Sequence, residues 1–201
     1  MRNESSQRSQ MKITIGIPTN RQFKPQTVSS LVQMVAYSKH DYSFVIPTKG
    51  YNTAENRNYI VAQAFKNNSD YLLLSDDDML YPPDSLEKLL AHKKDIVGAT
   101  YSVKQLPPSL VIGYGEQVKS DEEAKKQTKP FKCEALGGGL LLIKLEVFKK
   151  IKPPFFGYEW YDNGMVKMSN DWWFCKKARE AGIDIWCDPS IQCGHIGDYI
   201  F

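Results

Sequence analysis

The sequence has no hydrophobic run long enough to cross a bilayer, which takes about 20 apolar residues. Its polar start, from Arg2 to Gln10, also lacks the apolar segment that a secretory signal peptide needs. We therefore expect no transmembrane segment and a cytoplasmic location. Residues 1–10 are too polar to join a core, so we expect a disordered tail followed by one domain over residues 11–201.

A strong net charge is also absent, because 26 Lys and Arg against 23 Asp and Glu leave only +3. The two signs are mixed along the chain, which argues against nucleic acid as a partner. Cysteine is sparse, and Cys133, Cys175, Cys187 and Cys193 show no paired spacing, as expected of reduced thiols. Cys187, Cys193 and His195 are metal-ligand types, but their spacing matches no common zinc pattern.

The sequence also contains no Gly-x-Gly-x-x-Gly motif, so a dinucleotide-binding fold of that type is excluded. Its three consecutive glycines, Gly137–Gly139, follow no such pattern. Glycines without side chains do, however, permit a close approach of the backbone to a ligand.

Apolar runs of strand type alternate with segments of helical period, the pattern of an α/β domain built on a mainly parallel sheet. Strands are expected at Lys12–Pro18, Tyr42–Pro47, Tyr71–Ser75, Asp95–Val103, Leu140–Ile143 and Asp184–Asp188. One helix is expected to begin near Pro25, and a short one to end at Ile151. Three more are expected over Thr53–Asn67, Asp84–His92 and Asn170–Ala181. The predicted architecture is a Rossmann-like three-layer sandwich.

Several local signals refine these elements. Asp84 and Glu87 have the spacing of a capping box, Ser169 is an N-cap candidate, and Gly182 ends the last helix. The first helix has an apolar face made of Val28, Leu31, Val32 and Val35. Lys104–Lys132 is charged and aperiodic, so we expect an irregular excursion with a disordered middle over Lys119–Lys129. Lys152–Met168 is expected to be a long aromatic loop.

Three aspartates follow the run Tyr71–Ser75, which has the composition of a buried strand. Adjacent carboxylates at such a strand end repel one another, so their ionised state favours a bound divalent cation. Residues i and i+2 of an extended segment face the same way, so Asp76 and Asp78 converge while Asp77 points elsewhere. Ligands of open α/β sheets bind beyond the carboxyl ends of the strands, where these aspartates fall. The alternative is a solvated acidic turn.

Tyr71-Leu-Leu-Leu-Ser-Asp-Asp-Asp-Met-Leu80, with the later strand Asp95-Ile-Val-Gly98, resembles the D-x-D region of GT-A-fold glycosyltransferases, especially small family 2-like enzymes. Ile15-Gly-Ile-Pro-Thr19 resembles the first strand and nucleotide-binding loop of that family. Asn56-Arg57-Asn58 resembles its helix-borne element that approaches the nucleotide-sugar.

The resemblance continues in the second half of the chain and covers about residues 12–197. Gly137–Gly139 resembles the glycine turn beside the donor sugar and the acceptor. Ser169-Asn170-Asp171 resembles the family's E-D segment at a helix start, and Asp188 to Gly197 its closing segment. Asn170 stands where the family usually has Glu, so only Asp171 is carried over as a catalytic candidate.

The resemblance implies a metal-dependent glycosyltransferase that uses a nucleoside-diphosphate sugar and a glycan or other hydroxyl-bearing acceptor. Asp171 is the candidate base of an inverting reaction. The implied metal ligands are Asp76, Asp78 and His195, and an imidazole among carboxylates suits Mn²⁺ better than Mg²⁺. The implied substrate-binding residues are Pro18, Thr19, Arg21, Arg57, Asp76, Asp77, Gly138, Gly139 and Trp160.

Other interpretations remain open at this point. Arg57 can be a surface arginine of a helix, Asp171 a helix cap, and His195 a partly buried histidine. Trp160 belongs to an aromatic group that either stacks on sugar faces or covers the core. The alternatives for the whole chain are a nucleotidyltransferase that makes nucleotide-sugars, or a noncatalytic nucleotide- or carbohydrate-binding module.

Overall fold

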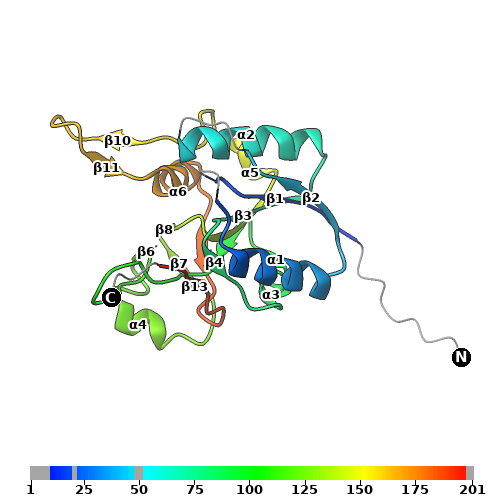
Figure 1. Ribbon diagram of the computed structural model, residues 1–201. Coiled ribbons are helices and arrows are strands. Elements are labelled where there is room, and N and C mark those ends of the chain that lie inside the picture. Colours follow the sequence, from blue (N-terminus) through cyan, green and yellow to red (C-terminus); the bar gives the residue numbers. More distant parts are fainter. Residues whose placement is uncertain (1–9, 20–21, 48–51, 198–201) are drawn as a thin grey trace, which may run out of the picture.

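A seven-stranded sheet runs through the centre of the computed structural model, which describes residues 10–19, 22–47 and 52–197 (Figure 1). Its strand order is β2-β1-β3-β9-β5-β12-β7. The strands are β1 (Lys12–Gly16), β2 (Asp41–Val45), β3 (Tyr71–Ser75), β5 (Ile96–Gly98), β7 (Phe131–Cys133), β9 (Leu140–Lys144) and β12 (Ile185–Cys187). Only β9 and β7 run against the other strands of this sheet, so the prediction of a mainly parallel sheet is confirmed.

Helices cover both faces of this sheet, which confirms the three-layer architecture (Figure 1). One face carries α1 (Pro25–Tyr37) and α3 (Ser85–Ala91). The other carries α2 (Thr53–Lys66), α5 (Val147–Lys150) and α6 (Asn170–Glu180). Within the described ranges, no helix is both long enough and apolar enough to cross a membrane.

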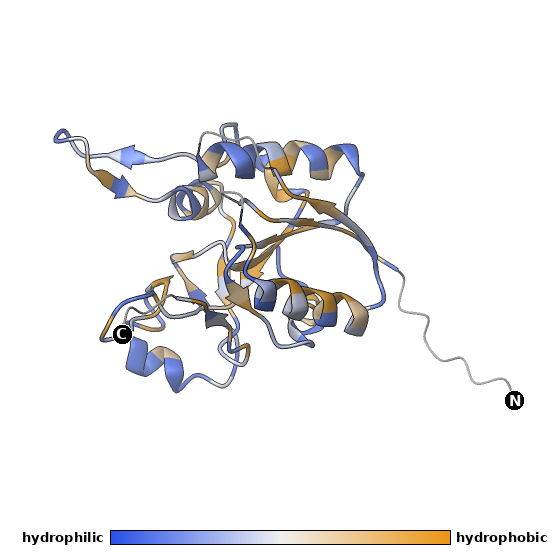
Figure 2. Cartoon of the chain, in the orientation of Figure 1, coloured by the Kyte–Doolittle hydropathy of each residue, from blue (hydrophilic) through white to orange (hydrophobic). Residues whose placement is uncertain are grey.

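The side chains of each strand alternate between the two cores, as the period of two requires. Leu72 and Leu74 of β3 belong to the core beneath α2 and α6, whereas Leu73 belongs to the core beneath α1 and α3. Both cores are apolar, so the central strands read as continuous hydrophobic runs, and Figure 2 shows this apolar band along the sheet.

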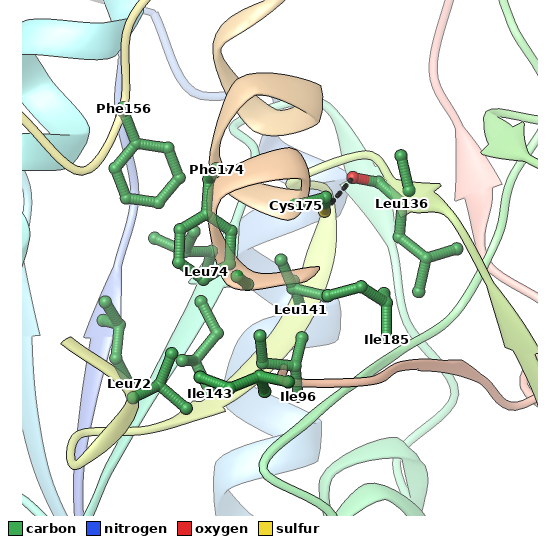
Figure 3. Packing of buried hydrophobic residues seen from close by; sticks show 14 of the residues in the cluster. Leu72, Leu74, Ile96, Leu136, Leu141, Ile143, Phe156, Phe174, Cys175 and Ile185 are labelled. Atoms are coloured by element: carbon green, nitrogen blue, oxygen red, sulfur yellow. Dashed lines mark hydrogen bonds between the residues drawn. The ribbon is translucent and has the colours of Figure 1, made fainter. Parts of the chain in front are cut away.

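The larger core, under α6, holds an aromatic pair at its centre (Figure 3). Phe174 of α6 stacks on Phe156 with ring centroids 4.9 Å apart. The thiol of Cys175 donates to the carbonyl oxygen of Leu136 at 3.8 Å. All four cysteines are free thiols, as the sequence predicted.

In the part of the chain that the structure describes, three short strand pairs stand outside the main sheet. β4 (Met79–Leu80) pairs with β13 (Gly194–His195), and β6 (Ile112–Gly113) pairs with β8 (Ala135–Leu136). The pair β10 (Glu159–Trp160) and β11 (Val166–Met168) forms an antiparallel hairpin that projects beyond α6 (Figure 1). The predicted aromatic loop therefore contains regular structure, because the turn at Gly164 adopts a positive φ of 82° that closes the hairpin.

The apolar face predicted for α1 is confirmed at Leu31 and Val35, which belong to or pack against the core, and is wrong at Val28 and Val32. Val28 and Val32 are 45% and 61% exposed, whereas the buried positions of α1 are Thr27, Ser30, Leu31 and Met34. Positions 28 and 32 lie one residue further round the helix than 27 and 31. The buried face includes the hydroxyl-bearing Thr27 and Ser30, so packing against the sheet, and not hydrophobicity alone, set the orientation of the helix.

The expected strand Asp95–Val103 is shorter in the structure, because the backbone beyond Ala99 bonds to the following segment instead of the sheet. Val103 donates its N–H to the carbonyl of Ser109 at 2.8 Å. The predicted disordered middle of the Lys104–Lys132 excursion is also wrong. It contains α4 (Asp121–Lys125), where the Ser120 hydroxyl accepts the Glu123 N–H at 3.2 Å.

The predicted capping box before α3 does not form. Asp84 pairs with Lys88 at 2.9 Å, and Glu87 lies 3.0 Å from Nε2 of His40, which the chain brings across from the end of α1. Ser169 does occupy the N-cap position of α6, but its hydroxyl donates to the Asp171 carboxylate instead of accepting a backbone N–H. Gly182 ends α6 with a φ of 76°, as predicted.

Candidate functional site

The predicted acidic cluster lies at the carboxyl edge of the sheet, where β1 and β3 run parallel and end side by side. Pro18 follows β1, and the aspartates follow β3, so both reach the same cavity. This cavity has a volume of about 260 Å³. Its lining comprises Pro18, Thr53, Asn56, Arg57, Asp76, Asp77, Asp78, Ser169, Asn170, Asp171 and His195. The structure therefore gathers residues from distant parts of the chain that the sequence assigned to one site.

Arg57 stands at the centre of this arrangement, with only 3% of its side chain exposed. Its two terminal nitrogens donate to Asp76 Oδ1 at 3.0 Å and to Asn170 Oδ1 at 2.5 Å, and Nη1 lies 3.7 Å from Asp171 Oδ2. The guanidinium also lies 5.9 Å from the ring centroid of Phe156. Because α2 supplies Arg57 and α6 supplies Asp171, this one side chain joins the D-x-D turn to the start of α6.

Its pKa shows how the charges balance. Burial alone would lower the pKa of Arg57, but Asp76 and Asp171 outweigh it and raise that pKa. The pKa of Asp76 is also raised, but here burial prevails. Arg57 lowers this pKa only in part, and Asp171 and Asp78 add to the rise. One guanidinium is thus shared between two carboxylates, and the cavity keeps an excess of negative charge.

Asp78 occupies the other side of the turn, next to His195. Pairing of β4 with β13 puts these residues together, because Ile196 donates its N–H to the Asp78 carbonyl at 2.8 Å. Asp78 Oδ1 lies 3.4 Å from His195 Nε2, and Oδ2 accepts a hydrogen bond from the Lys104 ammonium. Burial opposes ionisation of Asp78, but the bonds from His195 and Lys104 prevail and lower its pKa to about 2.

The orientation of His195 fits a metal ligand. Its Nδ1 lies 2.9 Å from the Ser102 carbonyl oxygen, which can only accept, so Nδ1 carries the proton. Nε2 is then the nitrogen that faces the Asp78 carboxylate. It donates to that carboxylate when the ring is protonated, and it offers a lone pair when the ring is neutral. Metal-binding histidines are held in this way, with the second ring nitrogen donating to a carbonyl. A carboxylate and the lone pair of a neutral imidazole would suit a shared cation.

The three predicted metal ligands do not all meet at one point. Asp76 turns toward Arg57, and only Asp78 and His195 are paired. Across residues 10–19, 22–47 and 52–197, no three His, Cys, Asp or Glu side chains surround a common centre, and this includes Cys187 and Cys193 with His195. The donors available at the site are thus a carboxylate–imidazole pair with a second carboxylate nearby.

Asp171 lies in the first turn of α6 and faces the same cavity. Its Oδ1 accepts the Ser169 hydroxyl and the Trp172 N–H, and its Oδ2 accepts the Gly138 N–H at 3.2 Å. These donors contact both oxygens of the carboxylate, which stands at the N-terminal end of the helix dipole. Asp171 is therefore held in one orientation with a side chain that is 16% exposed.

The glycine cluster makes room for protein side chains. A Cβ on Gly138 would lie 2.1 Å from Arg57 Nη2, and one on Gly139 would lie 2.6 Å from the Tyr101 ring. Gly139 also donates its N–H to the Tyr101 hydroxyl at 3.2 Å. Neither glycine lines the described cavity, so their observed contacts are with Arg57, Asp171 and Tyr101.

The other predicted substrate residues lie in different places. Asp77 lines the cavity and accepts the Lys24 N–H on its carbonyl at 3.1 Å. Thr19 is buried outside the cavity lining, and Trp160 is 57% exposed on the hairpin, 5.8 Å from the Tyr158 ring. Arg21 lies outside the described residues.

Sequence reasoning missed several residues of the site. Thr53 belongs to the first turn of α2, and its place one turn before Arg57 was the available signal, whereas Asn56 was already part of the element assigned to the nucleotide-sugar. Asn170 was noted only as a departure from the family pattern, yet it binds Arg57 and donates to the Tyr158 hydroxyl at 3.1 Å. Lys104 was assigned to an irregular segment, and no local pattern marks it as a partner of Asp78.

No protein-family model and no curated protein sequence matches this chain. Among solved structures, A197 from STIV is similar over 94% of this chain and 87% of that chain, with a TM-score of 0.65 and 18% identity. GalNAc-T7, solved with UDP, GalNAc and Mn²⁺, is similar over 94% of this chain, with a TM-score of 0.62 and 11% identity. The similar part is 44% of the GalNAc-T7 chain. Together with the sheet order and the helical layers, these similarities show a GT-A-like fold.

Proposed function

We propose that the protein is a glycosyltransferase that moves a sugar from a nucleoside-diphosphate sugar to an acceptor hydroxyl, with a divalent cation bound by Asp78 and His195. The observation that carries this proposal is the cavity at the carboxyl edge of β1 and β3. It combines four carboxylates with one shared guanidinium and an imidazole whose Nε2 faces a carboxylate. GalNAc-T7, which shares the fold, was solved with UDP and Mn²⁺.

The cation, Mn²⁺ or Mg²⁺, would neutralise charge on the departing nucleoside diphosphate. Hydrogen bonds within the chain fix the orientation of the side chains around it. Arg57 fixes Asp76 beside the turn that carries Asp78, and the Ser102 carbonyl fixes the His195 ring. Pro18 and Thr53 line the same cavity from β1 and α2, where a nucleotide would enter.

Asp171 is assigned as the base that takes the proton from the acceptor hydroxyl. It stands at the α6 N-terminus, and backbone and hydroxyl donors fix its orientation. Arg57 lies 3.7 Å away and links this base to Asp76 on the donor side. A base on the face opposite the leaving diphosphate gives an inverting reaction.

The acceptor side is assigned to the hairpin β10–β11, which leads outward from the cavity. Tyr158 receives a hydrogen bond from Asn170 at the cavity wall, and Trp160 follows it with an exposed ring. Two neighbouring aromatic rings offer apolar faces on which a sugar ring can stack. This arrangement favours a glycan acceptor.

Calorimetry with a panel of UDP, GDP, ADP and CDP, in Mn²⁺ and in EDTA, tests the proposal. We expect one nucleotide to bind in Mn²⁺ and only weakly in EDTA, because the carboxylates repel an unaccompanied pyrophosphate. Asp78→Ala should remove the Mn²⁺ dependence. Asp77→Ala is the matched control, because its carboxylate has no contact with His195 or Lys104, and it should keep most of the dependence. Equal affinity in Mn²⁺ and EDTA would contradict the proposal.

A further inference from the structure

Lys104 belongs to the segment after β5 and reaches Asp78, whereas Arg57 contacts Asp76. Its ammonium donates to Asp78 Oδ2, and its side chain is 37% exposed. The stem of Lys104 passes over Gly197, where a Cβ would meet Lys104 Cδ at 3.7 Å. A lysine from a segment of the chain distant from β3 thus occupies one of the two oxygens of the assigned metal ligand.

The second oxygen of Asp78 faces His195, so both oxygens of this carboxylate are engaged. A divalent cation that binds Asp78 therefore competes with the Lys104 ammonium for the same negative charge. The Lys104 side chain has room to change its conformation, because a separate cavity of about 350 Å³ adjoins it. Lys104 and His195 both line that cavity, and His195 also lines the acidic one.

We propose that Lys104 is a movable counter-cation, which neutralises Asp78 in the empty site and transfers to the diphosphate when a divalent cation replaces it. This inference rests on the proposed function, because it takes Asp78 and His195 as the metal site. Arg57 cannot take this part, since it is buried and bound to Asp76 and Asn170. Lys104 is partly exposed, and its flexible stem lets the ammonium move.

Charge compensation explains why the transfer is favourable. A nucleoside diphosphate carries more negative charge than one divalent cation neutralises. The cavity itself already has an excess of carboxylates, so the remaining charge needs another positive group nearby. Lys104 can supply this positive group, because its ammonium already pairs with Asp78 at the edge of the site.

The test measures Mn²⁺ binding without nucleotide, and then the binding of inorganic pyrophosphate at saturating Mn²⁺, by calorimetry. Lys104→Met should bind Mn²⁺ about tenfold more tightly, because the competing charge is gone. The same variant should bind pyrophosphate about tenfold more weakly in Mn²⁺. Lys104→Arg keeps the charge and should stay near wild type in both. The control is Lys149→Met, because Lys149 is exposed, pairs with Glu146 and does not line the acidic cavity.

The outcomes separate this inference from the proposed function. Unchanged Mn²⁺ affinity in Lys104→Met, together with its loss in Asp78→Asn, would overturn the role of Lys104 and leave the metal site standing. Tighter Mn²⁺ binding with unchanged pyrophosphate binding would overturn the transfer to the diphosphate. Mn²⁺ binding that is equal in wild type and Asp78→Asn would overturn the metal site and, with it, the role of Lys104.

Discussion

Replacing Arg57 with Met should destabilise the protein in a way that depends on pH. The side chain of Met fills much of the space beside Phe156 but leaves Asp76 and Asp171 without their shared cation. Removing one partner of a buried ion pair costs about 3–5 kcal/mol. The side chains of Asp76 and Asp171 remain 25% and 16% exposed, so water compensates in part, and we expect about 3 kcal/mol. For a chain of this length that lowers the melting temperature by roughly 6–12 °C.

The pH dependence follows from the direction of the Asp76 pKa. Burial already raises the pKa of Asp76 in the folded state, and removing Arg57 raises it further. A carboxyl with a raised folded pKa binds more protons when folded, so stability falls as pH rises from the unfolded value, near 4, through the folded pKa. The loss in Arg57→Met should therefore be largest at neutral pH and small near pH 4.

Urea denaturation of wild type and Arg57→Met between pH 4 and pH 8 measures this difference. Arg179→Met is the matched control, because Arg179 and Glu134 are 41% and 55% exposed and 3.8 Å apart. That exposed pair should contribute at most about 0.5 kcal/mol at any pH. A loss in Arg57→Met that is the same at pH 4 and pH 8 would refute the electrostatic reasoning and assign the effect to packing.

Three further predictions concern the surroundings of this arginine and one distant pair. Gly138→Ala should cost about 1–3 kcal/mol in urea denaturation, because the new Cβ would lie 2.1 Å from Arg57 Nη2, which its hydrogen bond to Asp76 holds in place. Asp171→Asn should lower turnover by roughly two orders of magnitude with unchanged nucleotide affinity in calorimetry, and near-normal turnover would exclude it as the base. His92 lies 2.7 Å from buried Asp188, whose pKa burial would raise but His92 and neighbouring donors lower. His92→Ala should therefore cost about 1–3 kcal/mol at pH 7, and the difference should disappear as pH falls below about 4.

The sequence was sufficient to predict six of the seven strands of the sheet and residues at the centre of the cavity, because both depend on local patterns. It missed β7, which begins inside the segment Lys104–Lys132 that was expected to be irregular. The run Tyr71–Ser75 is apolar on both sides, which marks a central strand, and its aspartates lie where such strands end. Arg57 and Asp171 were found because each stands in the first turns of a helix beside a recognisable motif. The roles of these residues in binding and transfer stay predictions.

Contacts between distant segments could not be predicted in the same way. Lys104 lies 26 residues from Asp78, in a stretch without periodicity, so only the folded chain brings them together. The capping of α3 failed for a similar reason, because His40 pairs with Glu87 from 47 residues away. In α1, packing against the sheet buries Met34 and leaves Val32 exposed, and the apolar pattern of the helix does not distinguish these two positions.

The position of β9 has a consequence for how the protein is made on the ribosome. β9 lies between β3 and β5 and is antiparallel to both, so neither strand has its partner on that side until Lys144 has been synthesised. At about 5–20 residues per second, the roughly 70 residues that separate the end of β3 from the end of β9 take about 3–14 s. During that interval the unpaired N–H and C=O groups of β3, between the apolar side chains of Leu72–Leu74, are open to pairing with other nascent chains. The short segment Leu140–Lys144 therefore ends the period in which a half-made chain is most prone to aggregate.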